Sequence, residues 1–237
     1  MPIDIEGKSA PYYIYEIDPK SWGGKAKAIQ FLGCGFPLNA QGIIATCKHV
    51  IEPVADGMIV IQHPTETNCH IVEDKLIHPD YDFSILKTKL STPNWIHPEE
   101  SELLLAASVW ACGYYDHEKI GDQYCVIPQV FTGTVTSSPR KDIGLPTLLP
   151  FYQVSFPALR GFSGSPLVYD GPDGGKLGGM LFGNRSSKVI ERYVDYIDEN
   201  GKNIIEKSER IFESGVAHTN ESIRKYSDDL GIEIWNN

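Results

Sequence analysis

The 237-residue sequence lacks any apolar run close to the roughly 18 residues that a membrane-spanning helix requires. Its first residues, MPIDIEGKSAPYY, are acidic rather than basic, and they lack the apolar stretch and the small-residue cleavage site of a secretory signal peptide. The sequence therefore predicts a cytoplasmic protein with neither a membrane anchor nor a membrane partner.

Basic residues are also scarce, because 21 Lys+Arg stand against 31 Asp+Glu and give a formal charge of −10. That balance disfavours nucleic acid or an anionic membrane as the main partner. Five cysteines are an odd number, and they form no CxxC pair, so the sequence predicts neither a disulfide framework nor a zinc site. A reducing compartment fits these five residues: Cys34, Cys47, Cys69, Cys112 and Cys125.

Short β-like runs, rich in Val, Ile, Tyr and Phe, are what the sequence has in quantity. Gly, Pro, Asn and Asp separate them at short intervals, which is typical of an antiparallel sandwich or barrel rather than of βαβ units. We expect strands at residues 12–17, 28–34, 42–46, 58–62, 69–77, 83–88, 108–113, 126–137, 152–156, 166–170, 177–182 and 189–196.

A polar stretch with two prolines, residues 91–101, interrupts this rhythm and predicts a connection between two β-halves, residues 1–95 and 96–237, that together form one domain. In the second half, Asn200-Gly201 predicts a hairpin turn. The charged run 193–213 around it reads as a long solvated hairpin, with a docking or regulatory arm as its functional interpretation.

Only the C-terminal end of the sequence looks helical. Thr219 or Asn220 is expected to cap a short helix that starts at Glu221 and ends near Leu230, before Gly231.

Three stretches carry the residue types that nucleophilic acyl transfer needs. His49 follows an apolar strand, Asp82 precedes one, and Ser163 lies in the glycine-flanked run GFSGSP. A serine hydroxyl is inert until a histidine accepts its proton, and a carboxylate must fix the tautomer of that histidine. Flanking glycines allow a tight turn, so the amides of Gly161 and Ser163 can converge on an oxyanion. The order His, Asp, Ser, each beside an apolar strand, predicts base, orienting acid and nucleophile.

Two of these assignments have a neighbouring alternative. Asp80 shares a face with Asp82 in an extended segment, but only Asp82 directly precedes the apolar strand 83–86. Ser165 is the other serine of the glycine-flanked run, but the spacing to Pro166 favours Ser163. The remaining histidines show no metal-ligand spacing and are predicted to be surface or strand-end residues: His63, His70, His78, His97, His117 and His218.

The same stretches resemble the motifs of trypsin-like serine peptidases of the chymotrypsin fold, and they are most similar to HtrA-type bacterial peptidase domains. TCKHVI (46–51) resembles the family's Thr-x-x-His stretch, DFSILK (82–87) its Asp stretch, and GFSGSP (161–166) its Gly-Asp/Asn-Ser-Gly-Gly-Pro motif. The resemblance runs from about residue 28 to 226, and no residues remain for a PDZ module. It implies two six-stranded antiparallel β-barrels, with the active site between them and a short C-terminal helix.

The departures from this family also matter. Trypsin-type zymogens carry an acidic residue at the position of Phe162, so activation through a new N-terminus is not expected. Ser165 replaces a usual glycine. Cys34 occupies the place of one half of a family disulfide whose partner position here is Val50, so free thiols are expected, although a bond from Cys34 to nearby Cys47 stays open.

The resemblance also implies a specificity pocket. Its base would lie near Pro157 and Ala158 and its walls near Phe182, Gly183 and Asn184. No carboxylate is present there to receive Lys or Arg, so the expected preference is for a small or medium apolar residue before the scissile bond.

The function expected from the sequence is serine endopeptidase activity on a polypeptide substrate, through an acyl-enzyme, with no metal or organic cofactor and under the control of a partner protein. The alternative is a latent or inert protease-fold scaffold, since Phe162 and Ser165 both alter the turn that shapes the oxyanion hole. A lipase-type esterase is disfavoured because its triad runs Ser, Asp, His on alternating strands and helices.

Overall fold

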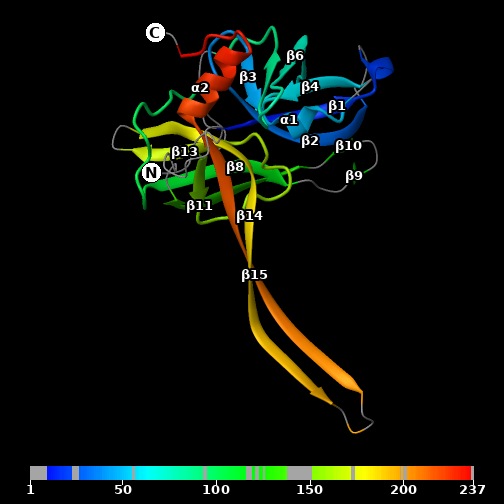
Figure 1. Ribbon diagram of the computed structural model, residues 1–237. Coiled ribbons are helices and arrows are strands. Elements are labelled where there is room, and N and C mark those ends of the chain that lie inside the picture. The colour runs from blue at the N-terminus through cyan, green and yellow to red at the C-terminus, as the bar shows by residue number, and fades with distance from the viewer. Residues whose placement is uncertain are drawn as a thin grey trace.

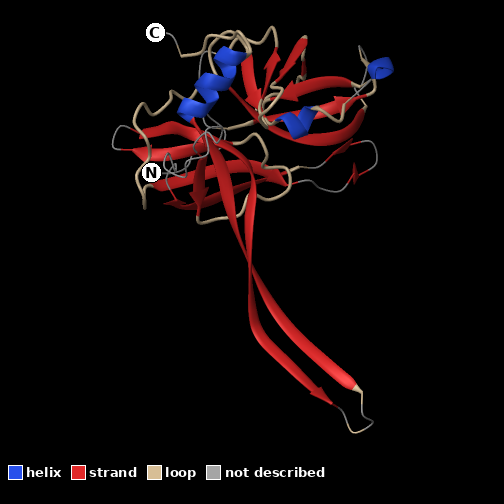
Figure 2. Cartoon of the chain, in the orientation of Figure 1, coloured by secondary structure: helices blue, strands red, loops and turns tan. Residues whose placement is uncertain are grey.

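The computed structural model describes residues 10–22, 27–54, 57–92, 95–115, 119–120, 123–124, 126–137, 151–171, 174–197, 199 and 202–235. Strands dominate these residues (Figure 2). The described helices are η1 (Pro19–Ser21), α1 (Lys48–Ile51) and α2 (Asn220–Asp229). None of them is long and apolar enough to cross a membrane.

The first half of the chain forms a curled antiparallel sheet of seven strands in the order β5-β4-β1-β2-β3-β7-β6. The two faces of β1 serve different core clusters, since Tyr12 and Ile14 belong to one and Tyr15 and Ile17 to the other. Bulges opposite β1 lie in β2, at Leu32 and Ile29. The strands are β1 (Tyr12–Ile17), β2 (Ala28–Pro37), β3 (Ile43–Thr46), β4 (Met58–Gln62), β5 (His70–Ile71), β6 (Asp74–Ile77) and β7 (Ser84–Lys87).

The second half forms a closed antiparallel barrel in the order β11-β12-β15-β14-β13-β8 (Figure 1). Its strands are β8 (Ser108–Tyr115), β11 (Ile127–Ser137), β12 (Phe151–Val154), β13 (Pro166–Gly171), β14 (Gly174–Ile197) and β15 (Asn203–Thr219), and β9 (Lys119–Ile120) and β10 (Gln123–Tyr124) form a separate small pair. Beyond the barrel, β14 and β15 continue together as a long ribbon that projects from the body.

One hydrophobic core joins the two halves. Phe83 from the sheet, Met180 from the barrel and Tyr226 from α2 belong to the same buried cluster. The ring of Tyr226 lies 5.5 Å from that of Phe83 and 4.5 Å from that of Tyr81. Helix α2, which follows the last barrel strand, thus packs on the sheet of the other half, and the strand ends that carry the candidate site are held in one arrangement.

The predicted all-β, chymotrypsin-like two-barrel fold is confirmed. In detail, the first sheet has seven strands and curls without the closure of a six-stranded barrel. His49 lies on α1, a single helical turn that the sequence analysis did not predict. The predicted boundary at residues 95/96 falls between β7 and β8, and as a domain division it stays a prediction.

The hairpin predicted in the charged run is present but much longer than expected. Strand β14 takes in two predicted strands, 177–182 and 189–196, and the polar residues between them, and it pairs with β15 up to Ile197 and Asn203. The Asn200-Gly201 turn lies outside the described residues.

Thr219 caps α2 as predicted, since its hydroxyl accepts a hydrogen bond of 3.1 Å from the amide of Ser222. Because Thr219 is buried, Thr219→Ala leaves that amide without its partner, and we expect a loss of about 1–2 kcal/mol of unfolding free energy in urea denaturation. Thr219→Ser keeps the hydroxyl and should lose less than half as much; equal losses would assign the effect to the methyl group.

Candidate active site

His49 and Asp82 meet at one end of the first sheet, where β3 ends and β7 begins. Strand β3 ends at Thr46, and the turn of α1 presents His49, while Asp82 lies two residues before β7. The Nδ1 atom of His49 lies 2.7 Å from Oδ2 of Asp82, and the amide of His49 donates to Oδ1 over 3.0 Å. Both carboxylate oxygens are therefore engaged, and the imidazole is held with its Nε2 edge free of this contact. Asp80, the alternative acid, makes neither of these bonds.

Asp82 is kept ionised by these contacts. Burial alone raises the pKa of a carboxyl group, but the hydrogen bonds from the side chain and backbone of His49 outweigh it, and the pKa of Asp82 lies below its ordinary value. A carboxylate in this state can orient the imidazole and stabilise its protonated form.

His218 lies behind Asp82 and was missed as a site residue. Its Nε2 atom is 3.2 Å from the backbone carbonyl of Asp82, so it carries the proton and donates. The ring stacks on Phe182 with centroids 4.1 Å apart and meets Tyr226 edge-on at 5.3 Å. Burial lowers the pKa of His218 to about 4.

The prediction of surface or strand-end residues holds for His218 and His78 only in its second part. Both lie at strand ends, at the end of β15 and directly after β6, but both are buried, with 6% and 3% of each residue exposed. His117 lies outside the described residues. The available signal for His218 was its place in the apolar run GVAHT, at the end of the closing barrel strand.

The loop that carries Ser163 connects β12 to β13 and is bound to β2 of the other half. The amide of Cys34 donates to the carbonyl of Ser163 over 2.9 Å, and the thiol of Cys34 donates to the carbonyl of Gly161 over 3.1 Å. On the far side, the amide of Gly164 donates to Leu181 in β14 over 2.9 Å. The loop is thus fixed from both halves of the molecule.

Glycine is required on both sides of Ser163. Gly161 has φ +94° and Gly164 φ +86°, conformations that other residues rarely adopt. A Cβ at Gly161 would lie 2.1 Å from the carbonyl oxygen of Tyr114, and one at Gly164 would lie 2.0 Å from that of Cys34. The glycines therefore allow this loop to approach the neighbouring backbone closely.

The two amides predicted to form the oxyanion hole have no partner within the described residues. Neither Gly161 nor Ser163 donates a backbone hydrogen bond there, whereas the intervening Phe162 donates to Leu159 over 2.9 Å. Unused donors on one tight turn are available to a developing oxyanion.

Ser163 and Ser165 differ in burial, and Phe162 between Gly161 and Ser163 is a buried residue that anchors the loop. Ser163 is partly exposed, whereas Ser165 is fully buried. Phe162 is also fully buried, and its ring meets Phe131 edge-on at 5.3 Å inside the barrel. Phe162 is thus a buried apolar residue at the position where trypsin-type zymogens carry an acidic residue.

The segments that carry His49 and Ser163 meet over the same point of β2. A Cβ at Gly33 would lie 3.0 Å from the side chain of Val50, next to His49, and 3.1 Å from the carbonyl oxygen of Ser163. These described residues show no hydrogen bond between His49 and Ser163, a contact that is often long in substrate-free sites. A groove of about 160 Å³ lies alongside, lined by His49, Arg160 and Gly161 among others.

The predicted specificity pocket is tied together by one side chain. Asn184 in β14 accepts from the amide of Ala158 over 2.6 Å and donates to the carbonyl of Ala158 over 2.8 Å. Phe182 is the extra residue of a bulge in β14, and its ring stacks on His218. Pro157 and Gly183 are adjacent to these contacts in the chain. Sequence reasoning named these residues but gave no sign of the Asn184 contact.

Cys47, His49 and Asp82 place a sulfur, a nitrogen and an oxygen within 4.8 Å of one another. Burial raises the pKa of the Cys47 thiol well above its ordinary value, and Nδ1 of His49 is already bound to Asp82. These atoms suit a hydrogen-bonded network better than a metal site. Among the described residues the cysteines are free thiols, so no Cys34–Cys47 bond forms, and Cys125 lies outside the described part.

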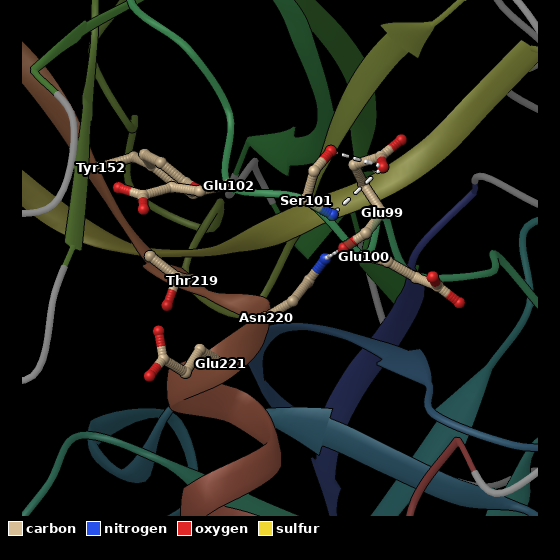
Figure 3. Close-up of a pocket in the computed structure, with 8 residues that line it drawn as sticks. All are labelled: Glu99, Glu100, Ser101, Glu102, Tyr152, Thr219, Asn220 and Glu221. Atoms are coloured by element: carbon tan, nitrogen blue, oxygen red, sulfur yellow. Dashed lines mark hydrogen bonds between the residues drawn. The ribbon is translucent and has the colours of Figure 1, made fainter.

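A second hollow, of about 80 Å³, opens where α2 begins (Figure 3). It is acidic, but Glu99 already accepts from Ser101 and lies 3.4 Å from Lys176. Asn220, at its centre, donates to the carbonyls of Glu99 and Leu177. The hollow is lined by none of the predicted site residues and reads as a structural junction of barrel and helix.

Comparisons with known proteins agree with this geometry. The family model for the trypsin-like peptidase domain matches residues 33–180, which is more than half of the chain. None of the curated proteins compared with the chain matches it. The chain belongs to the trypsin-like peptidase family.

Solved structures with a similar fold include HtrA-type proteases. AlgW, an HtrA-type protease solved with a decapeptide, has a TM-score of 0.61 and 19% identity over 96% of this chain and 66% of its own. The serine endoprotease from Yersinia pestis gives 0.59 and 16%, over 96% and 64%. The active form of the Rv3671c protease from M. tuberculosis gives 0.57 and 17%, over 100% and 87%. The chain thus spans less than two thirds of the first two relatives.

The buried His218 makes stability depend on pH. With a folded pKa of about 4 and an unfolded value of 6.5, His218 takes up a proton on unfolding between these values. Its contribution is fully present above pH 6.5 and is lost as the pH falls, by about 2 kcal/mol at pH 5. Urea denaturation at pH 7 and pH 5 should show this loss in the wild type.

The matched variants for this test are His218→Gln and His97→Gln, the second at an exposed position. His218→Gln should lack the 2 kcal/mol component, and His97→Gln should keep it. The same pH dependence in all three proteins would contradict the assignment to His218.

Proposed function

We propose that this chain hydrolyses peptide bonds through an acyl-enzyme, with Ser163 as nucleophile, His49 as general base and acid, and Asp82 as orienting carboxylate. The observation that carries the proposal is the pair of bonds between His49 and Asp82, because it leaves the Nε2 edge of the imidazole for the serine.

In this mechanism Ser163 attacks the peptide carbonyl while His49 accepts the hydroxyl proton at Nε2. The tetrahedral oxyanion is bound by the amides of Gly161 and Ser163, which the described residues leave unused. His49 then gives its proton to the leaving amine, and water attacks the acyl-enzyme with His49 as base. No cofactor is required by any of these steps.

The control by a partner protein, and the bacterial, cytoplasmic setting expected from the sequence, stay predictions. The unused amides of Gly161 and Ser163 bear on how a partner could control the activity. If such control operates, it would act on access to the site rather than on assembly of the oxyanion hole. The burial of Phe162 supports this, since the loop is anchored without the ion pair of a newly cleaved N-terminus.

Labelling with a fluorophosphonate, which reacts covalently with activated serines, tests the triad. Intact-mass analysis should show one adduct on the wild type and on Ser165→Ala, and none on Ser163→Ala. Asp82→Asn should slow labelling by about 10⁴-fold, because the imidazole loses its correct tautomer. A folded wild type that takes up no adduct would favour the alternative of an inert scaffold.

The pocket residues predict the substrate preference. Pro157, Ala158, Phe182, Gly183 and Asn184 carry no charge, and the amide of Asn184 is already paired with Ala158. We therefore expect cleavage after small or medium apolar residues in a peptide panel, by at least about tenfold over Lys and Arg. Cleavage confined to Lys and Arg would overturn this assignment of the pocket.

A further inference from the structure

The ribbon that projects from the barrel, defined as the arm, comprises residues 185–197 of β14 and 203–214 of β15 (Figure 1). Within the described part of the chain, 13 large hydrophobic side chains are exposed, and eight of them lie on the arm: Val189, Ile190, Tyr193, Tyr196, Ile197, Ile205, Ile211 and Phe212. A two-stranded ribbon is marginal in water without a further layer. An apolar concentration of this kind marks an interaction surface.

The register divides these residues between two faces. Opposed residues of an antiparallel pair lie on the same face, and successive pairs alternate. The pairs Lys188–Ile211, Ile190–Glu209 and Asp195–Ile205 therefore share one face, together with Tyr193 and Ile197. We call it the isoleucine face, and its five apolar side chains, Ile190, Tyr193, Ile197, Ile205 and Ile211, are each more than half exposed.

The opposite face is partly covered by its own residues. The Arg210 guanidinium lies 5.9 Å from the centroid of the Phe212 ring, and Val194 and Ile204 are only partly exposed. The isoleucine face is thus the apolar surface of the arm that most lacks a cover.

We propose that the isoleucine face binds the isoleucine face of a second copy of this chain, with the two arms antiparallel. A two-fold axis placed between the register pairs Ile190–Glu209 and Tyr193–Lys207 sets each strand opposite the same strand of the second copy. Lys188 then faces Asp195 of the second copy, twice by symmetry. Along the middle, Ile190 faces Tyr193 and Ile211 faces Ile205.

The charges select this orientation. A parallel pairing about a two-fold axis along the arms would set β14 opposite β15, so Lys188 would face Ile211 and Asp195 would face Ile205, with no opposite charge for either. It would also bring the two bodies to the same end of arms that pack about 10 Å apart. In the antiparallel pairing opposite charges meet and the bodies lie at opposite ends. Among the described side chains of the ribbon, the ion pair of Lys188 is a 3.9 Å contact with Glu209, and the Lys188 side chain is 64% exposed, so its ammonium group can reach the second copy.

The area of the contact indicates which class of interface the dimer belongs to. Twelve residues at about 3.3 Å each give a face about 40 Å long, and two strands give about 10 Å of width, so the two copies together contribute a footprint of about 800 Å². That value is below the roughly 1,200–2,000 Å² of stable specific interfaces, so we expect a weak, transient dimer with a Kd of about 10 to 100 μM.

Sedimentation velocity on the full chain, from about 1 to about 200 μM, tests the proposal. The mass should rise from the 26.4 kDa of one chain toward twice that value. Lys188→Asp and Asp195→Lys each turn two attractive contacts into repulsive ones and should raise Kd by about tenfold or more. An equimolar mixture of these two variants, or the double variant, restores opposite charges and should dimerise like the wild type.

Adjacent residues on opposite faces supply the control. Ile211→Ser should raise Kd by about tenfold, and Phe212→Ser should leave it unchanged. Thermal melting at low concentration verifies that each variant keeps a folded body. A wild type that stays monomeric over the whole range would overturn the proposal, as would single charge variants that the mixture does not rescue, or equal effects of Ile211→Ser and Phe212→Ser. These readouts need no peptidase activity, so they are independent of the proposed function.

Discussion

The contact between Cys34 and the loop around Ser163 is the interaction on which the site depends. The first half of the chain supplies His49 and Asp82, and the second supplies Ser163, so the geometry of the three groups is set by whatever fixes one half on the other. Two hydrogen bonds from Cys34 to this loop do so across the junction. Burial raises the pKa of the Cys34 thiol to about 12, which keeps its proton available as a donor.

Short-range signals were sufficient for most of the strands, and they singled out the three residues of the proposed triad, of which the structure joins His49 and Asp82 by hydrogen bonds. The strands at 12–17 and 58–62 have the predicted bounds, because short runs rich in Ile, Val and Tyr stand between turn-forming residues there. The pairing of His49 with Asp82 follows from the sequence order only through the resemblance. The contacts of Cys34 and Asn184 with distant backbone leave no local pattern, and sequence reasoning could not supply them.

Sequence reasoning did not predict the full length of β14 or the burial of His218. It split β14 at the polar residues 183–188 because a strand was expected to cover a core, whereas this part of the ribbon is solvated and needs no apolar alternation. It also gave no sign that His218, expected at the surface or at a strand end, is buried at the end of β15. The bulge at Phe182 provides an aromatic partner for this ring, and the carbonyl of Asp82 accepts its hydrogen bond.

A second bulge in β14, between Ile190 and Arg192, interrupts the ribbon about halfway along the arm. A bulge bends its strand and increases the local right-handed twist. The outer half of the arm therefore has a different direction and twist from the half that grows out of the barrel beside Asn184, so a surface that binds the whole arm must follow a bent ribbon rather than a straight one.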